Sequence, residues 1–414
     1  MERRTFIKDI ALVSSIVGTN SSILSPELFA KKSDAAKDGK VKPLAITMWD
    51  FSWLERRWPG AGYENWDKVL DELIERGYNA VRIDAFPHLI GADPFKEWTL
   101  IPVWDQNDWG SPGKNKVIVQ PSLNSFISKC KDRRVKVGLS SWYREDADNV
   151  RMKITTPEKM AENWIKVLEM LEKDNLLDAV LYVDLCNEWP GDLWAPFFTN
   201  EPAIWGYWHT EKSMNWMNAA LHIMKKSFPQ IPFLFSFDND RYEYYKEMKP
   251  PIDIAEHHLW MVKQNNEEFN KIVGYRYERF SSKGYINLAA NAEKLYKSRP
   301  EYWKNLLAAA IKRLAENSEK ANLPLITTEC WAIVDYKDWP LLNWDWVKEL
   351  CELGAITAAS TGNWIAIATS NFCGPQFKGM WRDVEWHLKV TDRIKSSAIK
   401  EKLLTEKVTN KMSL

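Results

Sequence analysis

Two apolar, strand-like runs of the chain each end in a glutamate. Residues 179–186 lead into Asn187 and Glu188, and Pro190 then prevents the strand from continuing. Residues 325–328 lead in the same way into Glu329. Two carboxyl groups at one pocket are the pair that cleavage of a glycosidic bond commonly uses, one as proton donor and the other as nucleophile or base. If this pair is functional, the fold must bring the two segments together.

Strand-like runs alternate with helical patterns after a polar stretch that ends at Lys42. Apolar residues recur at helical spacing from Trp66 up to Gly77, and again after Thr156 and Pro157, a helix start signal. The strands that we expect are 44–49, 80–86, 135–141, 179–186, 233–237, 254–260, 325–329 and, as the eighth, either 356–359 or 364–368. This alternation predicts an α/β fold, a single-domain parallel (β/α)₈ TIM barrel with long βα loops, and a carboxylate at the carboxyl end of a barrel strand is typical of catalysis.

The chain contains 23 tryptophans, and most of them fall at the expected strand ends or in the segments that follow, among them Trp104, Trp109 and Trp194. Connecting segments are normally polar, so aromatic ones need a reason. Long loops can pack on one another around satellite cores, or flat apolar side chains can line a cleft in which sugar rings stack. Both interpretations stay open at this point.

The two glutamate segments resemble the catalytic strands of the clan A glycoside hydrolases, the group that contains the family 5 cellulases and mannanases, and are most similar to its cellulase-like members. In that clan Asn-Glu at the end of the fourth strand supplies the acid/base, and a glutamate ending the seventh strand supplies the nucleophile. The resemblance therefore implies a retaining glycoside hydrolase that cleaves a β-glycosidic bond of an oligo- or polysaccharide by double displacement, with Glu188 as acid/base and Glu329 as nucleophile.

The resemblance also implies roles for neighbouring residues. Arg82 matches the second-strand arginine that supports the nucleophile, and its positive charge would lower the pKa of Glu329. Asn187 would bind the sugar hydroxyl next to the reacting carbon. His258 and Trp260 resemble a sixth-strand His-x-Tyr of the clan, with tryptophan in place of tyrosine, and Trp364 resembles the eighth-strand tryptophan on which the sugar stacks. We expect these three residues to bind substrate, together with the strand-end tryptophans Trp142, Trp189 and Trp331. Whether His257 or His258 faces inward is open.

The chain departs from the clan pattern around both glutamates, because Trp189 separates Glu188 from its proline and Cys330 follows Glu329. A non-catalytic carbohydrate-binding protein on the same barrel is therefore the alternative. A metal-dependent enzyme is a further alternative, although adjacent histidines on a strand point to opposite faces. Its ligands would come from the cluster His257, His258, Glu256, Asp238 and Asp240. We expect no metal and no cofactor.

The basic and acidic side chains balance, 56 against 56, so nothing favours a nucleic acid or an anionic membrane as partner, and a carbohydrate is the expected one. The sequence does not indicate an oligomeric state. Arg3 and Arg4 resemble a twin-arginine export motif, and the short apolar stretch 10–18 cannot span a bilayer. We therefore expect an export signal over 1–30, a linker over 31–42, the barrel over 43–397, a C-terminal tail over 398–414, and a periplasmic or extracellular location.

Overall fold

The computed structural model describes residues 41–104, 108–198, 207–238, 241–247, 249–275, 282–340 and 342–413. The predicted export signal over 1–30 and nearly all of the predicted linker lie outside these residues. Within the described ranges, no helix combines the length and the apolar character that crossing a bilayer requires.

Nine parallel strands form the central sheet, in the order β7-β6-β5-β2-β1-β13-β11-β9-β8. They are β1 (Leu44–Asp50), β2 (Ala80–Asp84), β5 (Lys136–Ser140), β6 (Val180–Asp184), β7 (Phe233–Leu234), β8 (Ser236–Phe237), β9 (Ala255–His257), β11 (Leu325–Thr327) and β13 (Trp364–Ala368). Only Phe235 separates β7 from β8, so the two are halves of one strand that pairs with β6 on one side and β9 on the other. The order therefore returns to its start, and the predicted eight-stranded barrel is confirmed.

The eighth strand of the barrel is the second of the two segments that the sequence offered. β13 pairs with β1 and with β11, whereas residues 356–359 lie within helix α11 (Asp345–Thr361). Two short strands, β10 (Leu259–Trp260) and β12 (Cys330–Trp331), continue the sixth and seventh barrel strands and pair with each other. This small ladder fixes the backbone around Glu329, whose carbonyl accepts a hydrogen bond from Leu259 at 3.2 Å.

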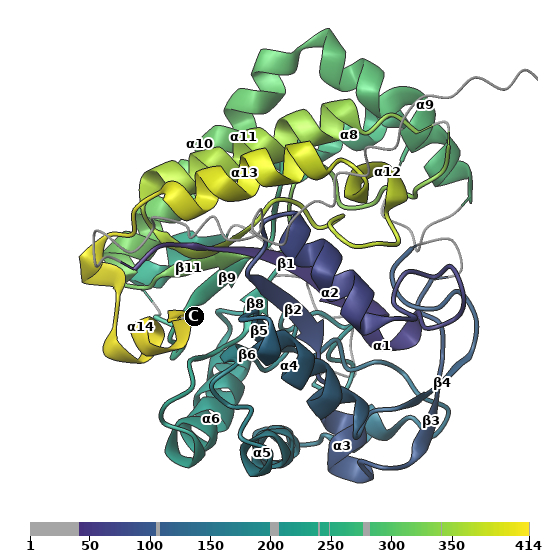
Figure 1. The fold of residues 1–414 in the computed structure, drawn as a ribbon. Coiled ribbons are helices and arrows are strands. Elements are labelled where there is room, and N and C mark those ends of the chain that lie inside the picture. Colours follow the sequence, from purple (N-terminus) through teal and green to yellow (C-terminus); the bar gives the residue numbers. More distant parts are fainter. Residues whose placement is uncertain are drawn as a thin grey trace, which may run out of the picture. The chain divides into compact units, whose positions relative to one another are not determined.

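Helices surround the strands (Figure 1). The main ones are α2 (Trp66–Glu75), α4 (Ser122–Asp132), α5 (Pro157–Lys173), α6 (Glu211–Ser227), α10 (Pro300–Ala321), α11 and α13 (Val384–Ser396). The side chains of Asn65 and Thr156 cap α2 and α5 by accepting backbone N–H groups at 3.1 and 3.2 Å. In α2 the predicted apolar residues Trp66, Val69, Leu70 and Leu73 are buried, whereas Ile74 is exposed. Between β8 and β9 the described chain carries a 3₁₀ helix, η3 (Arg241–Lys246), where strict alternation would place an α-helix.

The long βα loops that the sequence predicts follow the second, fourth and sixth barrel strands. The first contains α3 (Pro87–Ala92) and an antiparallel hairpin of β3 (Glu97–Leu100) and β4 (Asn115–Ile118). The segment after β10 contains α7 (Met261–Gln264), α8 (Asn266–Val273) and α9 (Ser282–Ser298). Shorter elements are α1 (Ser52–Glu55), η2 (Val150–Lys153) and α12 (Lys378–Trp381). Such segments lie at the carboxyl end of the barrel, where they can wall a site.

Residues 398–414, which we separated from the barrel as a tail, contain η4 (Glu401–Leu403) and α14 (Glu406–Met412). Val408 and Met412 are buried, and Lys411 Nζ donates a hydrogen bond to the Leu177 carbonyl at 2.6 Å. This segment therefore packs on the barrel beside the start of β6. All five cysteines are buried with free thiols, as small apolar core residues are.

Candidate active site

Glu188 follows β6 at the carboxyl end of the barrel. Its backbone is left-handed, with φ of 50°, a conformation that a non-glycine residue adopts at a cost of about 1–3 kcal/mol and that is enriched at functional sites. The Ser236 hydroxyl holds this backbone by accepting the Glu188 N–H at 3.1 Å. The two carboxyl oxygens accept hydrogen bonds from Trp194 Nε1 and from His258 Nδ1, each at 3.0 Å. These two hydrogen bonds fix the orientation of the Glu188 carboxyl group.

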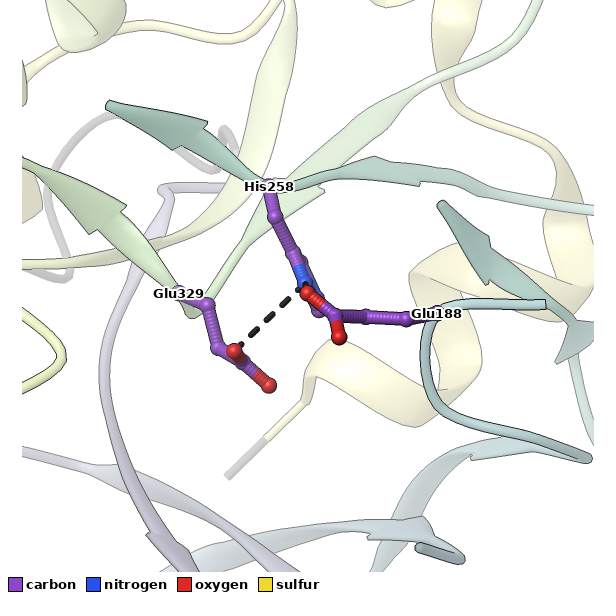
Figure 2. A group of neighbouring side chains, drawn as sticks. All are labelled: Glu188, His258 and Glu329. Atoms are coloured by element: carbon purple, nitrogen blue, oxygen red, sulfur yellow. Dashed lines mark hydrogen bonds and ion pairs between the residues drawn. The ribbon is translucent and has the colours of Figure 1, made fainter. Parts of the chain in front are cut away.

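Glu329 lies between β11 and β12, and its side chain meets that of Glu188. One carboxyl oxygen of each glutamate and a ring nitrogen of His258 lie within 4.8 Å of one another. Figure 2 shows these three side chains pointing toward a common centre from three different strand ends. Carboxyl groups about 5–5.5 Å apart are typical of retaining glycosidases, whereas inverting enzymes separate them by about 6.5–9.5 Å. The approach of one oxygen of each group to within 4.8 Å is closer than the inverting range.

His258, rather than His257, faces the two glutamates. Its Nδ1 lies 3.0 Å from Glu188 Oε1 and 3.5 Å from Glu329 Oε2, so this nitrogen carries the proton. Burial lowers the pKa of His258 well below its ordinary value, so the ring is neutral. His257 points away and bonds the Tyr245 hydroxyl at 2.5 Å through Nε2. The site therefore contains a neutral imidazole that donates toward both carboxyl groups.

Arg82, in β2, lies beneath the glutamates and is fully buried. It donates hydrogen bonds to Asp184 at 2.6 Å and to Asn187 Oδ1 at 2.7 Å, and its guanidinium lies 3.5 Å from Glu329 Oε1. A further carboxylate, Glu256, lies 3.6 Å from it. Burial lowers the pKa of Arg82, and the carboxylates of Glu256 and Asp184 raise it more strongly, so the side chain stays charged.

The charge of Arg82 does not give Glu329 the low pKa that the sequence predicts. Burial and the neighbouring carboxyl group of Glu188 raise the pKa of Glu329 well above its ordinary value, and Arg82 opposes this rise without cancelling it. The physical reason is that Arg82 is shared, because Asp184 and Glu256 take up much of the same positive charge. Glu329 therefore holds a proton more tightly than an isolated glutamate does.

Asn187 is oriented by Arg82. Its Oδ1 accepts from the guanidinium, so its Nδ2 is left as a buried donor without a partner in the described structure. Unpaired buried donors are rare in folded proteins and call for an explanation. This nitrogen is available for the sugar hydroxyl that the resemblance assigns to it.

Aromatic side chains wall the cavity above the glutamates. Two predicted residues, Trp142 and Trp260, line it together with the loop tryptophans Trp104, Trp109 and Trp194. The remaining lining residues are Met48, Asp50, Phe51, Glu188, Glu329, Val334, Asp335 and Asn371. The cleft interpretation of the loop tryptophans is therefore correct for these positions.

A second cavity of about 240 Å³ adjoins the first and shares Glu188, Val334 and Asp335 with it. Its wall comes from α7, α8, α9 and the segment after β12, and it includes the apolar side chains of Val262, Phe269, Leu288 and Ile333. An ion pair between Lys263 and Asp238 forms part of its polar wall. The two cavities therefore meet at Glu188.

Three tryptophans predicted to bind substrate are not brought to this site. Trp189 directly follows Glu188, and Trp331 lies two residues after Glu329. Trp189 donates to Ser213 of α6 at 2.7 Å, and Trp331 packs on Gly354 of α11. Trp364 begins β13 and so lies at the amino end of that strand, where it donates to Thr327 at 2.9 Å. These predictions are wrong, because all three residues pack away from the cavity.

Sequence reasoning did not assign a role to Asp184, and it considered Asp238 and Glu256 only as metal ligands. Asp184 in β6 and Glu256 in β9 could have been found, because each is an acidic residue inside a buried strand. A buried charge needs a partner, so such a residue indicates a polar network in the barrel. Asp238 follows β8; burial, then the charge of Glu188, raises its pKa to about 7 against the effect of Lys263.

The metal cluster considered from the sequence is not gathered, since His257 points away from the site and Asp240 lies outside the described residues. Among those residues, the group close enough to hold an ion is formed by Glu188, His258 and Glu329. Two carboxylates and one imidazole are also what an acid/base pair with a supporting donor requires. The geometry alone therefore fits metal binding as well as acid/base catalysis.

Comparisons with known proteins place the whole barrel in one family. The family model described as "Cellulase-like: Sugar-binding cellulase-like" matches residues 46–395. A crystal structure of a "putative glycoside hydrolase" from Parabacteroides distasonis is similar at 58% identity and a TM-score of 0.88, over 90% of this chain and 99% of that one. The GH5_18 protein from Streptomyces cattleya in complex with GlcNAc shares the fold, with 11% identity and a TM-score of 0.50 over 87% of this chain and 83% of that one. No protein with a curated description matches. The predicted resemblance to cellulase-like proteins is confirmed.

Proposed function

The chain belongs to the sugar-binding cellulase-like family, and on that premise we propose that it is a retaining glycoside hydrolase acting on a β-glycosidic bond of an oligo- or polysaccharide. The observation that carries the proposal is the approach of Glu188 and Glu329, whose carboxyl oxygens lie within 4.8 Å of one another in an aromatic cavity. One sugar ring can contact both groups at this separation.

In the first step Glu329 attacks the anomeric carbon while Glu188 protonates the departing glycosidic oxygen. The carbon–oxygen bond to the leaving group breaks, and an ester bond between Glu329 and the sugar forms. Glu188 has then lost its proton and can take one from water, which attacks the same carbon and releases Glu329. The reaction needs one proton on the pair, and the raised pKa of Glu329 favours its retention there.

The neighbours of the pair have matching tasks. The neutral His258 donates from Nδ1 toward both glutamates, so it can stabilise the negative charge that passes from Glu329 to Glu188 as the ester forms. Arg82 fixes Asn187 so that its free Nδ2 can bind a sugar hydroxyl. Because Glu188 is shared by the two cavities, the sugar that is attacked lies on the Glu329 side and the leaving group lies in the cavity beyond Glu188.

The test is a pair of substitutions compared on two leaving groups. Glu329→Gln should abolish turnover of any active substrate while preserving the fold. Glu188→Gln should lower the rate by roughly 10²–10⁴-fold on a sugar leaving group, and by much less on a 2,4-dinitrophenyl leaving group, which needs no proton. Small and equal effects of both substitutions on both substrates would refute the proposed roles.

A sugar-binding protein without hydrolytic activity is the second candidate, and the raised pKa of Glu329 favours it, because a protonated carboxyl group is a poor nucleophile. The two functions differ in one measurement. Binding of a glycan by the wild-type chain, with no hydrolysis of aryl or natural β-glycosides at any pH between about 4 and 9, would support the binding protein.

Export through the twin-arginine route is a separate proposal, based on Arg3 and Arg4 alone. Cell fractionation of the Arg3→Lys, Arg4→Lys double variant tests it. Retention of the variant in the cytoplasm, together with export of the wild type, is the expected result, and equal export of both would contradict it.

A further inference from the structure

Three side chains in the wall of the glutamate cavity share an unusual hydrogen-bonding state. Asp50 Oδ1 accepts the backbone N–H of Ser52, Asp335 Oδ2 accepts the Tyr275 hydroxyl, and Asn371 Nδ2 donates to the Val334 carbonyl at 3.1 Å. In each case the second polar atom, an oxygen, is buried and has no partner. The three residues are only 1–2% exposed.

These unpaired oxygens are fixed in position by the bonds that their partner atoms make. Asp50 also has a left-handed backbone, with φ of 41°, as Glu188 does at the end of its own strand. Strained backbone and unsatisfied buried polar atoms are both retained mainly at functional sites. Three such atoms around one cavity indicate a ligand that supplies several hydrogen-bonding groups at once.

The chemistry of the wall identifies the kind of ligand. A hydroxyl group both donates and accepts, so it can pair with a carboxylate, a protonated carboxyl group or an amide oxygen. Burial raises the pKa of Asp335 to about 8 and also raises the pKa of Asp50. A ligand group beside them must therefore be able to pair with a protonated carboxyl group as well as with a carboxylate. Among the described lining residues none is a lysine or an arginine, and Arg82 is engaged with Asp184, Asn187 and Thr328 below the cavity.

We propose that Asp50, Asp335 and Asn371 bind the hydroxyl groups of one neutral sugar ring, and that they set the specificity of the cavity against uronic acids. A hydroxyl group can donate a hydrogen bond to the unpaired oxygen of Asn371, whereas the carboxylate of a uronate has no hydrogen to donate. The inference deepens the proposed function, since the ring it describes is the sugar attacked by Glu329.

Binding, rather than hydrolysis, provides the test. Calorimetric titration of the Glu329→Gln protein would use the methyl β-glycosides of glucose, galactose, mannose, xylose and glucuronic acid as probes. At least one neutral glycoside should bind about 10-fold or more tightly than the glucuronide. Equal or tighter binding of the glucuronide, or binding of none of the neutral glycosides, would overturn the proposal.

Substitutions then assign the effect to the unpaired oxygens. Asp50→Asn and Asn371→Leu should each weaken binding of the preferred glycoside by about 10-fold or more. Asp146→Asn is the matched control, because Asp146 is equally buried but lies outside the cavity wall and both of its oxygens accept backbone N–H groups. Thermal melting of each variant verifies the fold, and affinities that stay unchanged in folded variants would overturn the proposal.

Deoxy sugars separate a direct contact from a structural effect. The loss caused by Asp50→Asn should disappear for the one monodeoxy analogue that lacks the hydroxyl bound by Asp50, and it should persist for the others. The same loss for every analogue would mean that Asp50 only supports the fold of the wall. Because hydrolysis is not measured, neutral-sugar binding without turnover would refute the proposed enzyme and leave this inference standing.

Discussion

The imidazole Nδ1 of His258 lies 3.0 Å from Oε1 of Glu188. The same nitrogen is 3.5 Å from Glu329 Oε2, so one N–H group faces both halves of the carboxyl pair. A neutral donor in this position stabilises whichever glutamate is ionised without neutralising it. During double displacement the negative charge moves between Glu329 and Glu188, and the fixed N–H dipole of His258 can stabilise it on either side.

His258 substitutions test this role. His258→Asn retains an N–H close to the position of Nδ1, whereas His258→Phe retains ring size without any donor. We expect the phenylalanine variant to lose at least about 10²-fold in kcat/KM and the asparagine variant to lose clearly less. Steady-state kinetics on an aryl glycoside measure both. Equal losses in two folded variants would show that the N–H group is not what matters.

The raised pKa of Glu329 predicts the acidic limb of the pH profile. The ionised carboxylate is the reactive form, so activity is lost as pH falls through a pKa that lies above the ordinary 4.5. The charge of Glu256 contributes to this rise, and Glu256→Gln should therefore move the acidic limb of kcat/KM to lower pH. An acidic limb at or below pH 4.5 in the wild type would contradict the electrostatics described for the pair.

The same pKa predicts that Glu329 destabilises the fold at neutral pH. An acid whose pKa is higher in the folded state binds its proton more tightly there, so the free energy of unfolding falls as pH rises above about 4.5. Glu329→Gln removes this loss and should raise the melting temperature at pH 7, with the difference vanishing below about pH 4.5. Melting curves across this range measure it.

Asp184→Asn is the contrasting variant for that experiment. Asp184 accepts from Arg82 at 2.6 Å and also from Ser140 and Ser236, so it is part of the buried network and carries no reacting role. Its substitution should lower the free energy of unfolding by about 3–5 kcal/mol at pH 7. A melting temperature that falls in both variants would show that Glu329 supports the fold.

The tryptophans divide into two groups with opposite expected effects. Trp364→Phe removes the N–H donor to Thr327 and should lower the free energy of unfolding by about 1 kcal/mol with kcat/KM unchanged. Trp260→Leu removes an aromatic wall of the cavity and should weaken sugar binding by about 10-fold, in addition to the stability lost with a buried tryptophan. Denaturant unfolding and titration calorimetry separate the two, and a reversed pattern would contradict the site as described.

Metal dependence is tested by removal and addition. Because the mechanism uses Glu188 and Glu329 as acid and nucleophile, prolonged treatment with a chelator should leave activity unchanged. Added Zn²⁺ should inhibit, since it can occupy the two carboxylates and His258 together. Loss of activity on chelation that the metal restores would support the metal-dependent alternative instead.

Patterns that repeat along the chain predicted the fold well. Strand-like runs ending in Glu188 and Glu329 specified both the barrel and the end of it that carries the site, because parallel strands present their carboxyl ends on one face. The loop residues Trp104, Trp109 and Trp194 line the cavity and also pack on one another, so both interpretations of the aromatic loops apply to them.

The errors come from side-chain direction. Trp189 and Trp331 were expected in the cleft because they lie close to the glutamates in sequence, but Trp189 bonds Ser213 of α6 and Trp331 packs on Gly354 of α11. The match of Trp364 relied on residue type, but its position at the start of β13 puts it at the opposite end of the strand. Asp50 and Asp335 were missed because hydrogen bonds that leave one oxygen free exist only in three dimensions.

The configuration of the first-formed product tests the central claim most directly. For any β-glycoside that the chain hydrolyses, the anomeric proton signal can be followed by NMR before mutarotation. Two carboxyl groups at the separation seen for Glu188 and Glu329 predict release of the β-anomer, with retention. Initial release of the α-anomer would mean direct attack by water, and Glu329 would then not be the nucleophile.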